Sequence, residues 1–120
     1  MSGVDVLNPV QVEQTIRELT GRISNSAKVC NDRYVAFSTT DRQYDHAYAV
    51  AYMAHEGPAH EKKYAAEIAT QEQREARDVA DAAYRYADRL AKALTAELMA
   101  YQSISKSVLA TYSAAGVGER

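Results

Sequence analysis

The sequence predicts an all-α protein, a long antiparallel helical hairpin with an additional N-terminal helix, assembled into a homo-oligomer. Three observations lead to this fold class. The 120 residues include twenty-two Ala but only five Gly and two Pro, and Ala is the strongest helix former. Apolar residues recur at steps of three or four over two long stretches, as on one face of a helix. Gly57-Pro58 separates the two stretches, and neither shows the alternating pattern of a strand.

The first helical region is expected to begin at Asn8-Pro9-Val10-Gln11. Asn8 can cap the helix, Pro9 suits the first helical position, and Gln11 completes a capping box. From this start the expected apolar stripe comprises Val12, Ile16, Leu19, Ile23, Cys30, Tyr34, Phe37, Tyr44, Tyr48 and Ala51 or Tyr52.

Gly21 and the run Ser24-Asn25-Ser26 favour a break in this region near residues 20–26. Gly costs about 1 kcal/mol in a helix interior, and Ser and Asn compete for backbone hydrogen bonds. We therefore expect an N-terminal helix over 9–23 and a first long helix over 26–56. The apolar spacing also allows one continuous helix.

Gly57-Pro58 is the clearest helix break in the sequence. Gly can adopt the left-handed conformation that caps a helix C-terminus, and Pro cannot continue the ladder of hydrogen bonds. The first long helix should therefore end near His55. Residues 57–70 then form a connector, in which residues 58–69 can be either a short helix or an extended arm.

A second long helix is expected over 71–113, followed by a tail over 114–120. Thr70 and Gln73 fit a capping box at its start, and its length would be roughly 60 Å at 1.5 Å per residue. Its expected buried stripe comprises Val79, Ala83, Tyr86, Leu90, Leu94, Leu98, Tyr101, Ile104, Val108 and Tyr112.

The end of this helix predicts self-association. Between Leu98 and Val117 only Lys106 is charged, and the apolar side chains spread around more of the helix than one partner helix can cover. An Ala-rich hairpin also buries little area per residue, so association would supply further burial. The expected subunit interface comprises Leu98, Tyr101, Ile104, Val108, Leu109 and Tyr112.

The sequence offers no constellation for catalysis, a metal or a cofactor. His55 and His60 are five residues apart with Gly57-Pro58 between them, unlike the pair four apart on one helix that holds zinc. Cys30, the only cysteine, falls on the apolar stripe, where it is expected to act as a small hydrophobe. We expect no catalytic residue, no metal, no cofactor and no small-molecule substrate.

Cysteine content and the N-terminus bear on location. One cysteine allows no intramolecular disulfide, and Met1 to Gln11 lacks the basic start and apolar core of a signal peptide. No window approaches eighteen apolar residues. The expectation is a cytoplasmic protein with no membrane contact.

A formal net charge of −2 means that any nucleic-acid site must be a local basic patch. The candidates are two connector lysines, cations at helical spacing in the second helix, and one lysine near its end: Lys62, Lys63, Arg74, Arg77, Arg85, Arg89, Lys92 and Lys106. Acidic neighbours such as Glu75 and Asp78 favour a charge-balanced surface instead. Tyr44, Tyr48 and Tyr52 share one helical face and can either stack bases or fill the core.

Three features together carry a resemblance to a known family. They are a Tyr-bearing first long helix, a connector with the paired Lys62-Lys63, and a last helix that ends in the run AYQSISKSVLA over 100–110. Over about residues 26–115 this layout resembles the UvsY-like recombination mediators of phages. The resemblance implies a helical protein that forms rings, binds single-stranded DNA and helps a recombinase replace the single-strand-binding protein.

We therefore expect a phage-type accessory protein of recombination or replication, located in the host cytoplasm. By the resemblance, Lys62 and Lys63 would meet phosphates, Tyr101 to Tyr112 would lie in the assembly helix, and a recombinase or single-strand-binding protein would be the partner. The alternative is a structural or adaptor oligomer, such as a virion component or an inhibitor of a host protein, without nucleic-acid contact.

Overall fold

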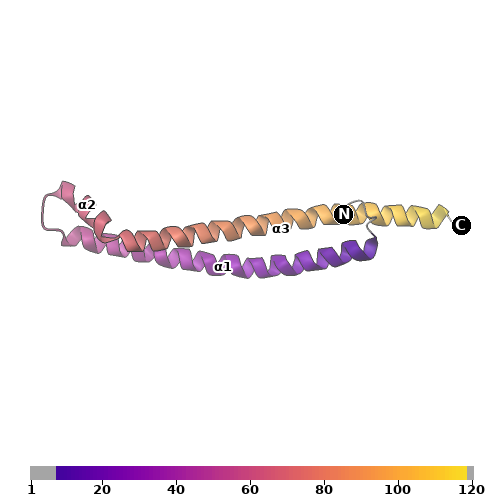
Figure 1. Cartoon of the computed structure of the whole chain (residues 1–120), viewed down its shortest axis with the longest axis horizontal. Coiled ribbons are helices and arrows are strands. Elements are labelled where there is room, and N and C mark those ends of the chain that lie inside the picture. The colour runs from indigo at the N-terminus through magenta and orange to yellow at the C-terminus, as the bar shows by residue number, and fades with distance from the viewer. Residues whose placement is uncertain (1–7, 119–120) are drawn as a thin grey trace, which may run out of the picture. The chain divides into compact units, whose positions relative to one another are not determined.

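The computed structural model describes residues 8–118, and nearly all of them are helical. The helices are α1, Pro9–Ala54, α2, Ala59–Ala69, and α3, Gln71–Gly118 (Figure 1). No strand occurs between residues 8 and 118, so the all-α prediction is confirmed for that part of the chain. Over the same range, no helix is long and apolar enough to cross a membrane. Residues 119–120 of the expected tail lie outside the described residues, and α3 continues five residues beyond the expected end at 113.

The capping box expected at the start of α1 is present. The Asn8 Oδ1 atom accepts a hydrogen bond of 2.9 Å from the Gln11 backbone N–H. In return, the Gln11 Oε1 atom accepts one of 3.4 Å from the Asn8 N–H. These bonds pair backbone donors that would otherwise lack a partner at the helix end.

The break expected near residues 20–26 does not occur, because α1 passes through this segment without interruption. The Ser26 hydroxyl donates to the carbonyl three residues earlier at 2.8 Å, and the Thr20 hydroxyl to the carbonyl four residues earlier at 2.9 Å. Both hydroxyls are thus bonded within the helix and do not replace its backbone bonds. Gly21 has open space around it. The separate helix expected over 9–23 is therefore wrong.

The turn between α1 and α2 leaves little space beside Gly57. None of the described residues has a positive φ, so the left-handed cap expected at Gly57 is absent. A Cβ atom there would lie 2.8 Å from His55 Nε2 and 3.0 Å from Glu61 Oε1. These two side chains approach each other at 3.3 Å across the turn. Pro58 then precedes the first residue of α2 in an extended conformation.

A single non-helical residue, Thr70, separates α2 from α3. Thr70 is buried, and its hydroxyl donates a 2.6 Å hydrogen bond back to the Ala66 carbonyl in α2. The Thr70 side chain therefore closes the end of α2 and does not cap α3, although the Thr70 carbonyl accepts a hydrogen bond of 3.0 Å from the Arg74 N–H at the start of α3. The expected capping box with Gln73 is wrong, and the buried Gln73 Oε1 atom has no hydrogen-bond partner.

The chain divides into two compact units. The hairpin unit, Lys28–Arg89, contains the end of α1, all of α2 and the beginning of α3. The terminal unit combines Met1–Ala27 with Leu90–Arg120, of which residues 8–27 and 90–118 are described. In the hairpin unit, α1 and α3 run side by side in opposite directions, with α2 at the end where they connect (Figure 1).

Inter-helix contacts fix this antiparallel arrangement in the hairpin unit. The rings of Tyr34 and Tyr84 meet edge to face with centroids 5.5 Å apart, and Asp41 lies 3.7 Å from Arg77. Buried or half-buried positions of α3 here recur at alternating steps of four and three, the coiled-coil period. They include Gln73, Arg77, Ala80, Tyr84 and Ala87.

In the terminal unit the core is a narrow row of aliphatic side chains. Val12 and Leu19 of α1 and Leu94 of α3 are buried. Half-buried residues extend this core: Ile16, Ile23, Leu98, Tyr101, Ile104 and Val108.

Part of the stripe expected on α3 is exposed. Val79, Tyr86, Leu90 and Tyr112 are exposed, whereas Leu94 is buried as expected. In the hairpin unit, the expected stripe lies about a third of a turn around the helix from the residues that face α1. The facing residues include Gln73, Arg77 and Ala80, which are polar or small, so a search for large apolar residues passes over them.

We expect Gly21→Ala to raise the free energy of unfolding by about 1 kcal/mol, because Ala is the better residue for an exposed helix interior. Urea denaturation followed by circular dichroism measures the change. Gly57→Ala is the matched control and should give no gain, since its methyl group would displace the His55 and Glu61 side chains. Equal stabilisation by both variants would contradict the crowded turn at Gly57.

Candidate nucleic-acid interface

Three tyrosines form a row along α1 in the hairpin unit. The ring centroids of Tyr44 and Tyr48 are 6.1 Å apart, and those of Tyr48 and Tyr52 are 6.3 Å apart with the rings stacked. All three residues are half-buried. Their spacing places them on one face, as expected, and their mutual contacts favour a packing role over base stacking.

A cation lies over each end of this row. The Arg77 guanidinium is 4.7 Å from the centroid of Tyr44, and the Lys62 Nζ atom is 5.8 Å from that of Tyr52. Both distances fall within the range, up to about 6 Å, over which a ring attracts a cation. Two of the expected DNA-binding cations therefore have partners inside the hairpin unit.

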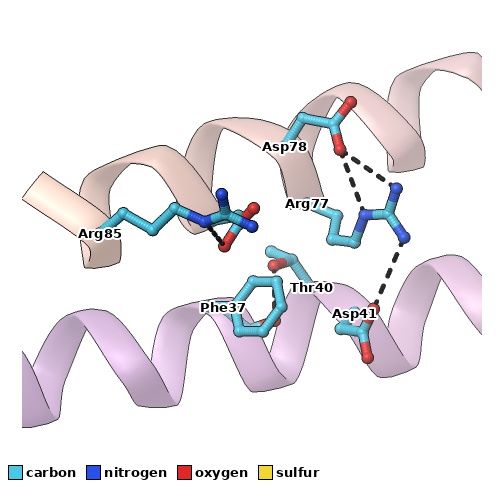
Figure 2. A network of polar contacts seen from close by, with 7 residues as sticks. Phe37, Thr40, Asp41, Arg77, Asp78 and Arg85 are labelled. Carbon is cyan, nitrogen blue, oxygen red and sulfur yellow. Dashed lines mark hydrogen bonds and ion pairs between the residues drawn. The ribbon is translucent and has the colours of Figure 1, made fainter.

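Arg77 is also the centre of a polar network between α1 and α3 (Figure 2). Its Nε and Nη2 atoms donate to Asp78 Oδ1 at 3.2 and 3.1 Å, and its Nη1 atom lies 3.7 Å from Asp41 Oδ1. Partial burial lowers the pKa of Arg77. The hydrogen bond to Asp78 and the electrostatic interactions with Asp78, Tyr44 and Asp41 outweigh this effect and raise the pKa of Arg77 above its ordinary value. Arg77 therefore holds α1 to α3 as a permanent cation.

The other candidate cations divide between the two units. In the hairpin unit, Arg85 donates from Nε to Asp81 at 3.1 Å but stays largely exposed. Lys63, Arg74 and Arg89 are exposed in the same unit. In the terminal unit, Lys92 has an interaction partner, and Lys106 borders a hollow with Ile16, Gln102 and Ser105.

A groove of about 590 Å³ lies beside the junction of α2 and α3 in the hairpin unit. Its apolar lining comes from Ile68, Val79 and Ala82. Arg74 is its single cation, against three carboxylates from Glu67, Glu75 and Asp78. This acidic excess repels phosphate, so Arg74 is poorly placed for DNA.

The face of α2 that combines charge with an aromatic ring is formed by Lys63 and Tyr64. Lys62 lies over Tyr52, whereas Lys63 is exposed and Tyr64 is 61% exposed. Helical spacing puts His60 on the same face, three and four residues before them. Tyr64 is not predicted as a site residue, because the sequence allows residues 58–69 to be either a short helix or an extended arm. The helix that begins at Ala59 makes its exposure evident.

The residues expected at the subunit interface separate into two groups. Leu98, Tyr101, Ile104 and Val108 are half-buried within the terminal unit, and Leu109 and Tyr112 are exposed. The first group is thus partly used by the fold, and the second is available to a partner.

Metal-ligating and reactive residues do not gather in the described part of the chain. Between residues 8 and 118, no three or more His, Cys, Asp or Glu side chains lie close enough together to hold a metal ion. Cys30 is half-buried in the hairpin unit. His55 is half-buried beside Glu61, and His60 is exposed on α2.

The fold and these surfaces define an all-helical protein whose units are each built on paired, antiparallel segments of α1 and α3 (Figure 1). Comparison with protein families, characterised proteins and solved structures finds no match to the chain.

We expect Arg77→Ala to lower the free energy of unfolding by about 1–2 kcal/mol, because it removes a cation–π contact and an inter-helix ion pair. The measurement is urea denaturation. Arg85→Ala is the matched control, since its exposed ion pair lies within α3 and contributes about 0.5 kcal/mol or less. If the control loses as much stability as Arg77→Ala, the network in Figure 2 does not hold the two helices together.

Proposed function

We propose that the protein is a self-assembling accessory protein of phage-type DNA recombination or replication, which binds single-stranded DNA and helps to load a recombinase. The observation that carries this proposal is the outward-facing pair Lys63 and Tyr64 on α2. An exposed ring beside a cation can stack on an unpaired base while the cation meets the backbone phosphate. The resemblance to UvsY-like mediators suggests the biological role, and by that resemblance α2 would correspond to their basic connector.

A single α2 face would bind DNA weakly. One ring contributes about 1–3 kcal/mol per stacked base, and one lysine neutralises one phosphate. Several copies on one assembly would raise the affinity through effective concentration. Self-assembly, for which Leu109 and Tyr112 remain exposed, is therefore part of the proposed function.

Fluorescence anisotropy of a labelled, single-stranded oligonucleotide tests DNA binding. We expect binding at low salt that weakens as salt rises, because counterions are released on binding. Lys63→Glu and Tyr64→Ala should each weaken binding about tenfold or more, since each removes one of the two paired contacts. Lys28→Glu is the matched control, an equal charge reversal at an exposed site of α1, and should retain most of the affinity.

Two results would count against DNA binding at α2. One is no change in anisotropy at micromolar protein and low salt. The other is equal loss of affinity in Lys63→Glu and Lys28→Glu, which would indicate an effect of net charge alone.

A structural or adaptor oligomer without DNA contact is the second candidate. Lys62 and Arg77 are engaged within the hairpin unit, and the end of α1 presents a different, apolar surface. There Val50 is exposed and Met53 is 76% exposed, beside the polar residue His46. Methionine adapts readily to partner surfaces. An oligomer that gives no anisotropy change at low salt would favour this candidate.

A further inference from the structure

In the hairpin unit, α3 has a second apolar seam that α1 does not cover. Val79 and Tyr86 are 64% and 69% exposed, and Ala83 between them is half-buried. Steps of four and three residues join the three positions, which is the spacing of a coiled-coil seam. The seam toward α1 uses other positions of the same helix, such as Tyr84. A further helix can therefore pack along Val79, Ala83 and Tyr86.

The charges beside this second seam are self-complementary. Glu75, Ala82 and Arg89 are all exposed and follow one another at intervals of seven residues, so they form one row on the flank of the seam. A second copy that runs antiparallel, with a twofold axis at Ala82, would bring Glu75 against Arg89 of the other copy at two places. A parallel copy would instead set Glu75 against Glu75.

The groove beside the junction of α2 and α3 also favours a second, antiparallel copy of the chain. It shares Val79, Ala82 and Glu75 with the second seam and its flank, and its lining carries more acidic than basic side chains. In the antiparallel arrangement, Arg89 of the other copy enters this acidic surface. The small side chain of Ala82 at the axis allows the two helices to approach closely.

We propose that two copies of this chain dock through their hairpin units, antiparallel along Val79, Ala83 and Tyr86, with Ala82 at the twofold axis and Glu75 paired with Arg89. One self-complementary patch is sufficient for such an interface. This proposal rests on the self-assembly of the proposed function, adds a second surface to that of Leu109 and Tyr112, and does not depend on DNA.

Charge reversal tests the pairing. Glu75→Arg and Arg89→Glu should each weaken the dimer about tenfold, because each sets like charges together at two places. An equimolar mixture of the two variants should recover the native affinity, since opposite charges then meet at both contacts. Sedimentation velocity at low salt measures the association, and circular dichroism checks the helix content. Arg42→Glu, a reversal at an exposed site of α1, should leave it unchanged.

A cysteine at the axis tests the geometry. In a Cys30→Ser background, Ala82→Cys should form an intermolecular disulfide with oxidised glutathione at least about tenfold faster than Ala36→Cys, an exposed alanine of α1. Equal rates, a monomeric native chain, or a mixture that stays dissociated would each overturn the proposal. If Lys63→Glu and Lys28→Glu bind DNA with equal affinity, the proposed DNA site on α2 is contradicted, but the proposed dimer is not.

Discussion

Two helices side by side can bury only one stripe of each, and this limit governs how the chain uses its apolar residues. Among the described residues, the buried hydrophobic side chains are Val12, Leu19, Ala66, Ala87 and Leu94. Larger apolar residues, including Met53, Tyr64, Val79 and Tyr86, stay exposed. Exposed apolar side chains that form a continuous row are expected to contact a partner, whereas single scattered ones are normal on a protein surface. The proposed seam on α3 is such a row.

The seam between α1 and α3 in the hairpin unit relies on rings and charges more than on aliphatic packing. Tyr34 meets Tyr84, and Arg77 joins Tyr44 to Asp41. A seam of leucines tolerates a shift of one helix along the other, whereas a polar group with one matching partner defines the register. Arg77, with Asp41 and Tyr44 as its partners on α1, is a polar group of this kind, and these partners keep it from serving as a free cation for DNA.

Sequence reasoning was reliable where structure is decided locally. The all-α class and the capping box at Asn8 follow from residues only a few positions apart. It was wrong where one side chain could bond in two ways: Thr70 bonds backward to α2, and Ser26 bonds within its own helix. The spacing of residues in the sequence does not determine which backbone group either hydroxyl bonds to. The face of α3 that packs against α1 in the hairpin unit is not predicted because it includes Arg77, which a search for apolar residues rejects, whereas Leu94 in the terminal unit is buried as expected.

The candidate site was predictable only as a set of cations. Lys62 and Lys63 are adjacent in the sequence and are predicted to act together. In the structure, Lys62 lies over Tyr52 and Lys63 is exposed next to Tyr64, and this difference depends on a helical α2 and on the end of α1. The contact of Lys62 with Tyr52 joins residues ten positions apart across the turn that contains Gly57. Knowledge of the turn is therefore needed before the site can be identified.

The two proposals use different residues of the hairpin unit, and the second would determine how the first operates. In the proposed dimer, each α2 ends at Ala69, thirteen residues before Ala82, so the two α2 ends would lie roughly 39 Å apart along the seam at 1.5 Å per residue. A DNA strand long enough to reach both faces would bind the second Tyr64 at a high effective concentration, and a shorter strand would not. Avidity would then depend on strand length, with a threshold defined by the position of Ala82 in α3.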